Sequence, residues 1–439
     1  MKKVVFIIIS ILTILTYNNV YAKDIVKSIN KYNEESLKYI LNSYNENHEK
    51  DGIVSAGTFL KEKVKIEDEE YNDTQVILIK YNNKGKVIWK YVYGKTADDQ
   101  LLYLTYSYDA EKQIDGYLLF VNKTYDIGET VEVKPVVIKI DLKGQYVEEK
   151  EILSSNITIN KIINSYNNEN IIDGYILIGQ KDNRSFISKF DLSLNELWTK
   201  YFSEEYLNIT DIVMLRQDNI PKEYIAIVNT PNSKLINIDL EGNVKSILKE
   251  DFEEKDNPKI ISVDNSFILY GITNEVKLSN DKNTSFYIIK YNTNYEEEWE
   301  TVGDIPINND GVLELYPVYS KDQIKEYLMM SANSSDSSVE ITRIDLEGNI
   351  KNKVKKIKND YYNISSFIFD NKTLYLIGEI KCQEDDICEY ETNSLLLISD
   401  EDKVIEVKET DNSKVFIALG GFILVIITMY IILKYKKQK

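Results

Sequence analysis

Residues 42–57 read NSYNENHEKDGIVSAG, and residues 164–179 read NSYNNENIIDGYILIG. The two phrases align without a gap, and a third copy, YSYDAEKQIDGYLLFV, occupies residues 106–121 with the same spacing from Ser to Asp-Gly. Matches at fixed offsets indicate a structural repeat. We interpret the polar middle of each phrase as the turn between two strands, in which Asp-Gly supplies the positive φ of a hairpin. The Asp and Asn residues are then expected to serve turn chemistry, with calcium binding as the alternative.

A second phrase follows each of these and recurs along the chain. Each copy has two β-rich runs around a polar turn such as EGN or NKG, which is a hairpin signal. A shorter apolar run, such as YILIG, precedes each copy, and a weaker run precedes that one. The seven copies are VILIKYNNKGKVIWKYVYG (76–94), VVIKIDLKGQYVEEKEI (136–152), FISKFDLSLNELWTKYF (186–202), LINIDLEGNVKSILKE (235–250), FYIIKYNTNYEEEWETVG (286–303), VEITRIDLEGNIKNKVKKI (339–357) and LLLISDEDKVIEVKE (395–409).

Each unit therefore has four short strands, and the units recur about every 50 residues, a spacing typical of propeller blades. Four-stranded blades bury their faces only against their neighbours, so the ring has to close. The sequence predicts an all-β, seven-bladed β-propeller over residues 37–409, with one additional C-terminal transmembrane helix.

The tryptophans fall at one position of the second phrase, and only in copies 1, 3 and 5. Copies 2, 4 and 6 carry Ile-Asp-Leu-x-Gly instead. This alternation predicts either duplication by pairs of blades or large rings that pack over a smaller neighbour. We expect structural packing of the indoles, with ligand contact as the alternative. The repeat positions are Trp89, Trp198, Trp299, Asp141, Asp239 and Asp345.

Both ends of the chain look different from the repeats. Residues 1–22 combine Lys2 and Lys3 with a short apolar run and a cleavage site after Ala22, as in a secretory signal peptide. A retained N-terminal anchor is the alternative. Residues 415–433 carry no charge and, as a helix, would span about 28 Å, enough to cross a bilayer.

These ends predict a single-pass membrane protein. The basic tail 434–439 should stay in the cytoplasm, which leaves the propeller outside the cell. Residues 410–414 are expected to form a short stalk. Residues 23–36 are expected to form a leader; their apolar spacing also allows an amphipathic helix that continues to residue 41.

Composition limits the partners. Between residues 23 and 414 there are 71 acidic and 47 basic residues, a formal charge of −24. This field disfavours nucleic acid and anionic lipid as partners. Cys382 and Cys388 are expected to form a disulfide that closes a small loop. The number of possible ligands argues against zinc, because the chain has two cysteines and one histidine, His48.

No catalytic constellation can be assigned. GIVSAG (52–57) lacks the spacing of a nucleophile elbow, and Ser55 lies in a repeated strand. A carboxylate pair of a glycosidase cannot be chosen from 71 acidic residues. No cofactor and no metal are expected, although SNDKNTS (279–285) offers oxygen ligands and leaves calcium as an alternative.

The copies of DG-[YI]-hhhhG followed by hhhK-[hD]-xxG-xhhW resemble bacterial cell-surface β-propellers with repeats of the type DGGYhhhG…KLDsnGnhhW. KYNNKGKVIWKY (80–91) is also similar to the repeats of PQQ-type propellers. Quinone-dependent members of that group have eight blades and an adjacent cysteine pair, so the resemblance does not bring the cofactor to this chain. What the resemblance implies is a fold and a surface location.

These features predict a protein that is not an enzyme. We expect a non-catalytic binding module for protein or glycan at the cell surface, acting through loops on one rim of the ring. A scaffold or assembly factor for other envelope proteins is the alternative, and a glycan-active enzyme is the third. The step from fold to function rests on analogy.

Overall fold

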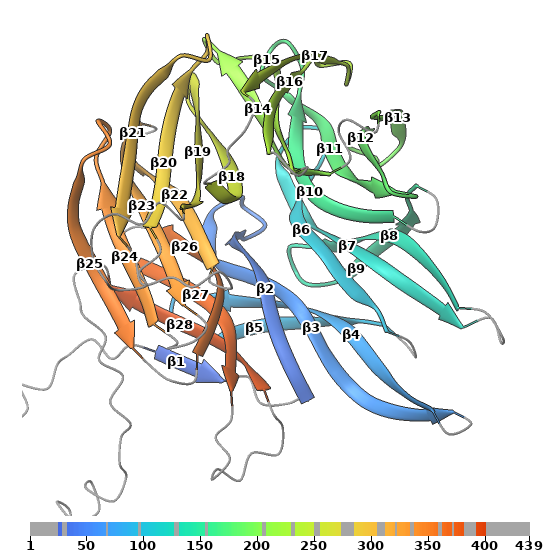
Figure 1. Cartoon of the computed structure of the whole chain (residues 1–439). Coiled ribbons are helices and arrows are strands. Elements are labelled where there is room, and N and C mark those ends of the chain that lie inside the picture. Colours follow the sequence, from blue (N-terminus) through green and yellow to red (C-terminus); the bar gives the residue numbers. More distant parts are fainter. Residues whose placement is uncertain are drawn as a thin grey trace, which may run out of the picture. The chain divides into compact units, whose positions relative to one another are not determined.

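The computed structural model describes residues 25–28, 33–66, 69–94, 98–126, 131–153, 157–203, 208–229, 233–249, 255–273, 285–304, 312–320, 323–333, 338–358, 362–370, 373–381 and 392–400. These residues form seven four-stranded antiparallel sheets, which are the blades of an all-β propeller (Figure 1). The predicted fold and the predicted number of blades are confirmed. Within the described part of the chain, no helix is long and apolar enough to cross a membrane. The helix predicted at 415–433 lies outside that part.

Each blade is built from consecutive strands, with its first strand innermost (Figure 1). Blade 1 has β2 (Asn33–Tyr44), β3 (Lys50–Ile66), β4 (Glu69–Asn82) and β5 (Val87–Tyr93). Blade 2 has β6 (Gln100–Tyr108), β7 (Ile114–Asp126), β8 (Val131–Asp141) and β9 (Tyr146–Glu151). Blade 3 has β10 (Ile157–Tyr166), β11 (Ile172–Lys181), β12 (Arg184–Asp191) and β13 (Glu196–Tyr201). Blade 4 has β14 (Ile209–Gln217), β15 (Ile220–Val228), β16 (Lys234–Ile238) and β17 (Val244–Lys249).

The remaining three blades complete the ring. Blade 5 has β18 (Lys255–Val263), β19 (Ser266–Thr273), β20 (Ser285–Asn292) and β21 (Glu297–Asp304). Blade 6 has β22 (Val312–Ser320), β23 (Gln323–Asn333), β24 (Ser338–Ile344) and β25 (Ile350–Lys358). Blade 7 has β26 (Tyr362–Asp370), β27 (Thr373–Lys381) and β28 (Thr392–Asp400), and its outer strand is β1 (Ile25–Ser28).

The start of the chain therefore closes the ring. β1 pairs antiparallel with β28, from Ile25 opposite Ile398 to Ser28 opposite Leu395. The prediction of a leader at 23–36 is corrected here, because this segment contains β1 and the beginning of β2. The helical alternative for the segment is wrong for the same reason, since pairing with a distant strand overrides local periodicity. The outer strand expected within 401–409 lies outside the described residues.

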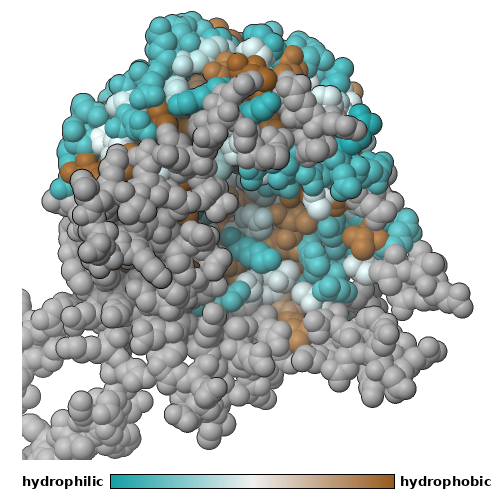
Figure 2. All heavy atoms as spheres, in the orientation of Figure 1, coloured by the Kyte–Doolittle hydropathy of each residue, from teal (hydrophilic) through white to brown (hydrophobic). Residues whose placement is uncertain are grey.

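The core consists of apolar layers between neighbouring blades. The second and third strands of a blade are covered on both faces, so they read as continuous apolar runs; every residue of β19 is buried. Val54 and Leu78 of blade 1, for example, pack with Leu119 and Ile138 of blade 2. Figure 2 shows apolar residues in the middle of the visible face, with hydrophilic residues around them.

The repeated phrase forms the turn between the first and second strands, as predicted, but its glycine has another role. The turn residues His48, Lys112 and Asn170 have left-handed φ angles of 61°, 68° and 57°, whereas Gly52 and Gly174 have φ of 158° and 159°, close to extended backbone. Gly174 instead lies in β11, where an added Cβ would be 1.8 Å from the backbone oxygen of Phe190. The glycine is required because the third strand approaches too closely for any side chain.

The aspartates of the Asp-Gly pairs bind lysines of the third strand. Lys80 pairs with Asp51, Lys139 with Asp115 and Lys189 with Asp173, each at 2.8 Å between Nζ and a carboxylate oxygen. Turn chemistry belongs to an earlier residue of the phrase: Asn45 Oδ1 accepts the backbone N–H groups of residues 47 and 49. The expectation of turn chemistry thus holds for Asn45 and fails for the aspartates of the Asp-Gly pairs.

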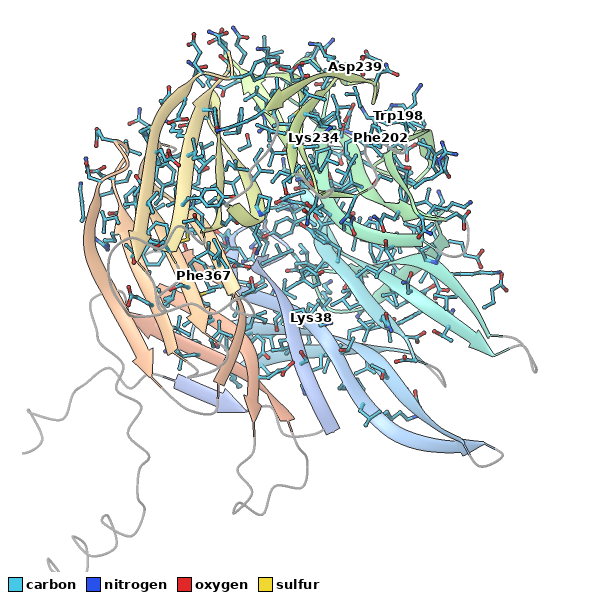
Figure 3. All side chains as sticks on the ribbon, viewed as in Figure 1. Lys38, Trp198, Phe202, Lys234, Asp239 and Phe367 are labelled. Atoms are coloured by element: carbon cyan, nitrogen blue, oxygen red, sulfur yellow. The ribbon has the colours of Figure 1, made fainter. Side chains whose placement is uncertain are left out.

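The tryptophans lie on outer strands and pack on the glycine turn of the next blade. A Cβ on Gly144 would be 2.5 Å from the indole of Trp89, and one on Gly348 would be 2.7 Å from the indole of Trp299. The Nε1 of Trp89 donates to the backbone oxygen of Leu142 at 3.2 Å. Figure 3 shows Trp198 beside the turn that begins at Asp239. The alternation therefore arises from a large ring that packs over a small neighbour.

The Ile-Asp-Leu-x-Gly phrase shapes that turn. Asp141 Oδ1 accepts the backbone N–H groups of Lys143 and Gln145. Asp345 Oδ1 accepts those of Glu347 and Asn349 in the same way. Where the preceding outer strand carries no tryptophan, the turn residue is large: Leu194 in blade 3 and Tyr295 in blade 5, both at positive φ. Large and small residues thus complement each other around the ring.

We expect Trp89→Ala to lower the free energy of unfolding by about 2–4 kcal/mol, because it removes a half-buried ring and its hydrogen bond. Urea unfolding of the variant and of the unsubstituted chain measures the difference. Glu148 is the exposed residue at the same repeat position of blade 2, so Glu148→Ala is the matched control and should change stability by less than about 0.5 kcal/mol. Equal effects of the two substitutions would contradict the packing role.

Candidate functional site

The two rims of the ring differ in their connections. All described first-to-second and third-to-fourth strand connections have five residues or fewer, and antiparallel order places them on one rim, the short-turn rim. The connections from the second to the third strand and from one blade to the next belong to the opposite rim. The first strands end at the short-turn rim, close to the axis of the ring. Side chains at these strand ends therefore surround one opening of the central channel.

The repeated phrase places a tyrosine at this end of the first strand. Ser-Tyr occurs at residues 43–44, 107–108 and 165–166. In each case the register slips by one residue between Ser and Tyr, so that the tyrosine follows a β-bulge. The same slip precedes Arg216 in blade 4 and Tyr319 in blade 6. We call these five residues, with Tyr106 and Tyr316, the channel mouth: Tyr44, Tyr106, Tyr108, Tyr166, Arg216, Tyr316 and Tyr319.

The tyrosines of the channel mouth are in contact across several blades. The rings of Tyr44 and Tyr106 are 5.8 Å apart between centroids and meet edge to face. Asn164 Nδ2 donates to the hydroxyl of Tyr108 at 3.0 Å, which links blades 2 and 3. Burial raises the pKa of Tyr316 to about 12, and the charges of Asp370, Tyr319 and Tyr44 add to the rise. The hydroxyl of Tyr316 is therefore protonated at neutral pH and can donate a hydrogen bond.

Arg216 is the cation of the channel mouth. Its guanidinium carbon lies 4.4 Å from the ring centroid of Tyr166. Its Nε donates to Asn170 Oδ1 at 3.1 Å. Burial and the charge of Asp264 raise the pKa of Tyr319, and Arg216 opposes the rise. The charges of Asp264 and Arg216 are therefore close enough to Tyr319 to act on its hydroxyl. The arrangement offers a fixed positive charge among partly exposed aromatic rings.

Below the channel mouth, polar side chains of the first strands bond to the next blade. Asp211 accepts the backbone N–H of Ile260 at 3.0 Å and pairs with Lys161. Lys259 Nζ donates to the backbone oxygen of Leu313 at 3.0 Å. Such bonds connect six of the seven blade junctions among the described residues. The residues of this polar belt are Tyr39, Asn160, Lys161, Asp211, Lys259, Glu314 and Ser365.

Glu314 in β22 is the second carboxyl group of the polar belt. Burial raises its pKa, while Lys259, the backbone N–H of Phe367 and the hydroxyl of Ser366 oppose the rise. Ser366 Oγ donates to Glu314 Oε2 at 3.3 Å. Asp211 is also bonded on both sides, so these two carboxylates join neighbouring blades.

The structure places the described residues that were singled out in the sequence at different positions and does not bring them together in one site. The tryptophans and the aspartates of Ile-Asp-Leu-x-Gly lie at blade junctions, away from the channel mouth. Ser55 is fully buried in β3, and His48 is exposed in a turn, where its Nδ1 is 3.1 Å from the backbone oxygen of Ile114. Cys382, Cys388 and nearly all of 279–285 lie outside the described residues. Among the residues described, no group of three or more His, Cys, Asp or Glu side chains could hold a metal ion.

Sequence reasoning missed the channel mouth, although two signals were present. Ser-Tyr is repeated inside the quoted phrases at a constant offset from Asp-Gly. The chain also has only three arginines among its 53 basic residues. Arginine differs from lysine in its planar guanidinium, which stacks on aromatic rings and donates two parallel hydrogen bonds, so the rare arginines are candidates for such a role. Neither signal shows that the residues meet, because that depends on the bulge and on the order of the blades.

The opposite rim contains a titratable group between blades 1 and 2. Asp99 is buried, and its Oδ1 accepts the backbone N–H of Thr124 at 3.1 Å. Burial raises the pKa of this carboxyl to about 6; Asp73 and Asp98 add to the rise, and Lys123 opposes it. Since its pKa in the unfolded chain is lower, the folded state binds the proton more tightly, and this contribution to stability is lost as pH rises through about 6.

We therefore expect Asp99→Asn to remove a pH dependence of stability. The free energy of unfolding of the unsubstituted chain should fall, relative to the variant, by about 1–1.5 kcal/mol between pH 5 and 8. Urea unfolding at a series of pH values measures this difference. Asp98→Asn is the matched control, because it removes the same charge from an exposed neighbour. A constant difference between Asp99→Asn and the unsubstituted chain would contradict the assignment.

Comparisons with known proteins give distant likenesses. No protein-family model and no curated protein matches the chain. The WD40 domain of SCAP from fission yeast is 11% identical, with a TM-score of 0.41, and the match covers 87% of this chain and 99% of that one. The Dos1 propeller is 10% identical, with a TM-score of 0.45 and coverage of 87% and 99%. A putative 6-phosphogluconolactonase from Bacteroides uniformis is 10% identical, with a TM-score of 0.42 and coverage of 83% and 100%. The fold of this chain rests on its own strand pairing.

Proposed function

We propose that this chain is a non-catalytic binding module that engages a protein or glycan through the short-turn rim of its propeller. The observation that carries the proposal is the channel mouth, where Tyr166 holds Arg216 and further tyrosines stand at the ends of the first strands of other blades. Tyrosine and arginine are the side chains most enriched at binding hot spots, because they combine large contact area with directed hydrogen bonds. Their convergence from blades 1 to 4 and 6 marks this opening as the recognition surface.

The proposal of binding without catalysis is supported by the use of the buried carboxylates. Asp211 and Glu314 are engaged by groups of the neighbouring blade. A glycosidase needs one carboxyl group to protonate a leaving oxygen and another to attack or activate water, both within reach of the sugar. The polar belt places its carboxylates in blade junctions instead, so its chemistry favours ring closure.

The location of the protein is part of the proposal. A signal peptide at 1–22 and a transmembrane helix at 415–433 would place the propeller outside the cell and residues 434–439 in the cytoplasm. A disulfide between Cys382 and Cys388 fits that compartment. A binding module held by one helix at the surface can meet partners in its own membrane, in the wall or on another cell.

Site-specific photocrosslinking in cells tests the recognition surface. A photoreactive phenylalanine analogue replaces Tyr319 at the channel mouth or, as the matched control, Tyr146 on the outer strand β9. Both tyrosines are 53% exposed, so accessibility does not distinguish them. We expect a defined crosslinked product from position 319 and none from position 146. The same products from both positions, or products from 146 alone, would contradict the proposal.

The second candidate is a scaffold for other envelope proteins. A scaffold differs from a free-standing binding module because it needs the membrane anchor and has a fixed neighbour in the same membrane. If the product from position 319 is one membrane protein and disappears when 415–439 is replaced by an unrelated anchor, the scaffold is favoured. A product that persists after this replacement favours the free-standing binding module.

A further inference from the structure

Arg216 is held in one orientation before any ligand arrives. Tyr166 supports one face of the guanidinium, and Asn170 Oδ1 accepts the hydrogen of its Nε. Both contacts come from blade 3, whereas Arg216 belongs to blade 4, so the junction of the two blades fixes the side chain. A planar guanidinium fixed in this way loses little conformational entropy when it binds.

The terminal amino groups of Arg216 are left for a partner. Within the described part of the chain, Arg216 has no ion pair, and its one side-chain hydrogen bond uses Nε. The charged residue nearest in the sequence, Asp218, lies in the exposed turn and makes no salt bridge with it. Two parallel N–H donors in a rigid fork match the two oxygens of a carboxylate.

Exposed large apolar side chains belong to the same turns and strand ends as the groups around Arg216. Ile171 follows Asn170 and is 41% exposed; Ile220, in the hairpin of Arg216, is 52% exposed; and Tyr319 is 53% exposed. Exposed large apolar side chains gathered on one surface indicate a site of protein contact. The surface therefore pairs one cation with an apolar surround.

We infer that the channel mouth binds a peptide segment of a partner protein in which an acidic side chain is flanked by aliphatic side chains. This inference rests on the proposed function, because it names the ligand of the proposed binding module. The carboxylate takes the fork of Arg216, and the aliphatic groups pack on Ile171, Ile220 and Tyr319.

The net charge of the chain further limits which partner proteins can bind. The chain carries a formal charge of −18, so it repels a protein that is acidic overall. Only a local acidic residue presented on a neutral or basic partner can approach Arg216 without that cost. The acidic residue then gives specificity of position, while the apolar contacts give most of the affinity.

Selection of displayed peptides on the full chain tests the inference. A library of random peptides of about a dozen residues is selected on the immobilised protein, and each enriched peptide is synthesised and titrated. We expect the enriched peptides to share Asp or Glu between Leu, Ile or Val. Replacement of that acid by its amide should weaken binding by about tenfold or more.

Variants of the chain assign the effect to Arg216. Arg216→Gln should also weaken binding by about tenfold or more, and Arg216→Lys should restore only a minor part of it, because lysine lacks the fork. Arg184→Gln is the matched control, since Arg184 also stacks on a tyrosine, Tyr201, but on the outer strand of blade 3. This control should leave binding unchanged. Melting of each variant confirms that it remains folded.

Each other outcome overturns the inference. Enriched peptides without an acid, or equal binding to Arg216→Gln, would show that the carboxylate is not recognised there. Failure to enrich any peptide, together with Arg216-dependent binding of oligogalacturonate, would assign the site to an acidic sugar. In each of these cases a crosslink from position 319 still supports a binding module, so failure of the inference is separate from failure of the proposed function.

Discussion

Gly174→Ala lowers the free energy of unfolding by about 3–5 kcal/mol, near the upper limit for a single substitution. The added methyl group would lie 1.8 Å from the backbone oxygen of Phe190 and 2.9 Å from its carbonyl carbon. Backbone atoms of a paired strand cannot move aside as the end of a side chain can. β11 and β12 must therefore separate locally, and their separation loosens the core on both faces of blade 3. Urea unfolding followed by tyrosine and tryptophan fluorescence measures the loss.

Gly85→Ala is the matched control for this prediction. Gly85 has a φ of 67°, and its added Cβ would be 2.7 Å from Cδ1 of Ile398, which is the end of a flexible side chain. Its cost should be about 1–2 kcal/mol, mainly from the left-handed backbone conformation. If the two glycines tolerate alanine equally well, the close approach of the third strand is not what selects glycine in the Asp-Gly pair.

Deletion of residues 23–30 opens the ring and should lower the melting temperature by about 10 °C or more. The deletion removes β1, so β28 loses its backbone partner from Leu395 to Ile398 and becomes an edge strand. Blade 7 then has three strands, and its free edge can pair with another molecule. We expect scanning calorimetry to show the lower melting temperature, and light scattering to show concentration-dependent association.

A synthetic peptide of residues 23–32 provides the control. If closure depends on backbone pairing, the peptide added to the shortened chain should bind the edge of β28 and raise its melting temperature. A scrambled peptide of the same composition should not. An unchanged melting temperature after the deletion would mean that the ring is held by its blade junctions and that β1 is dispensable.

Most of the fold could be predicted because its signals are local. Each hairpin contains its own turn residues and two apolar runs, so the blades could be counted from the sequence. β1 could not be predicted, because IVKS is too short to show a period and its partner begins only at Thr392. The role of Gly174 was assigned to the turn for a related reason: the close approach of β12 depends on pairing, which residue spacing does not reveal.

The candidate site could be predicted less well than the fold. The repeated Ser-Tyr is visible in the sequence, but the bulge that turns Tyr44 and Tyr166 toward the opening is a property of paired strands. Arg216 stands in a weaker repeat, DIVMLR, in which no Ser-Tyr marks the position. Its contacts with Tyr166 and Asn170 come from another blade, and only the order of blades around the ring brings them together.

Because large rings pack on small turns, two types of blade have to alternate around the propeller. A blade that ends in Trp89 or Trp299 must be followed by one with Gly144 or Gly348, and a blade with Leu194 or Tyr295 must follow one without tryptophan. Two alternating types of blade can close perfectly only in an even number, and this ring has seven. At least one junction must therefore be unlike the rest, and the junction where Gly85 meets Ile398, and where β1 joins blade 7, is such a place. A ring of the same two blade types with an even number of blades would contain no such junction.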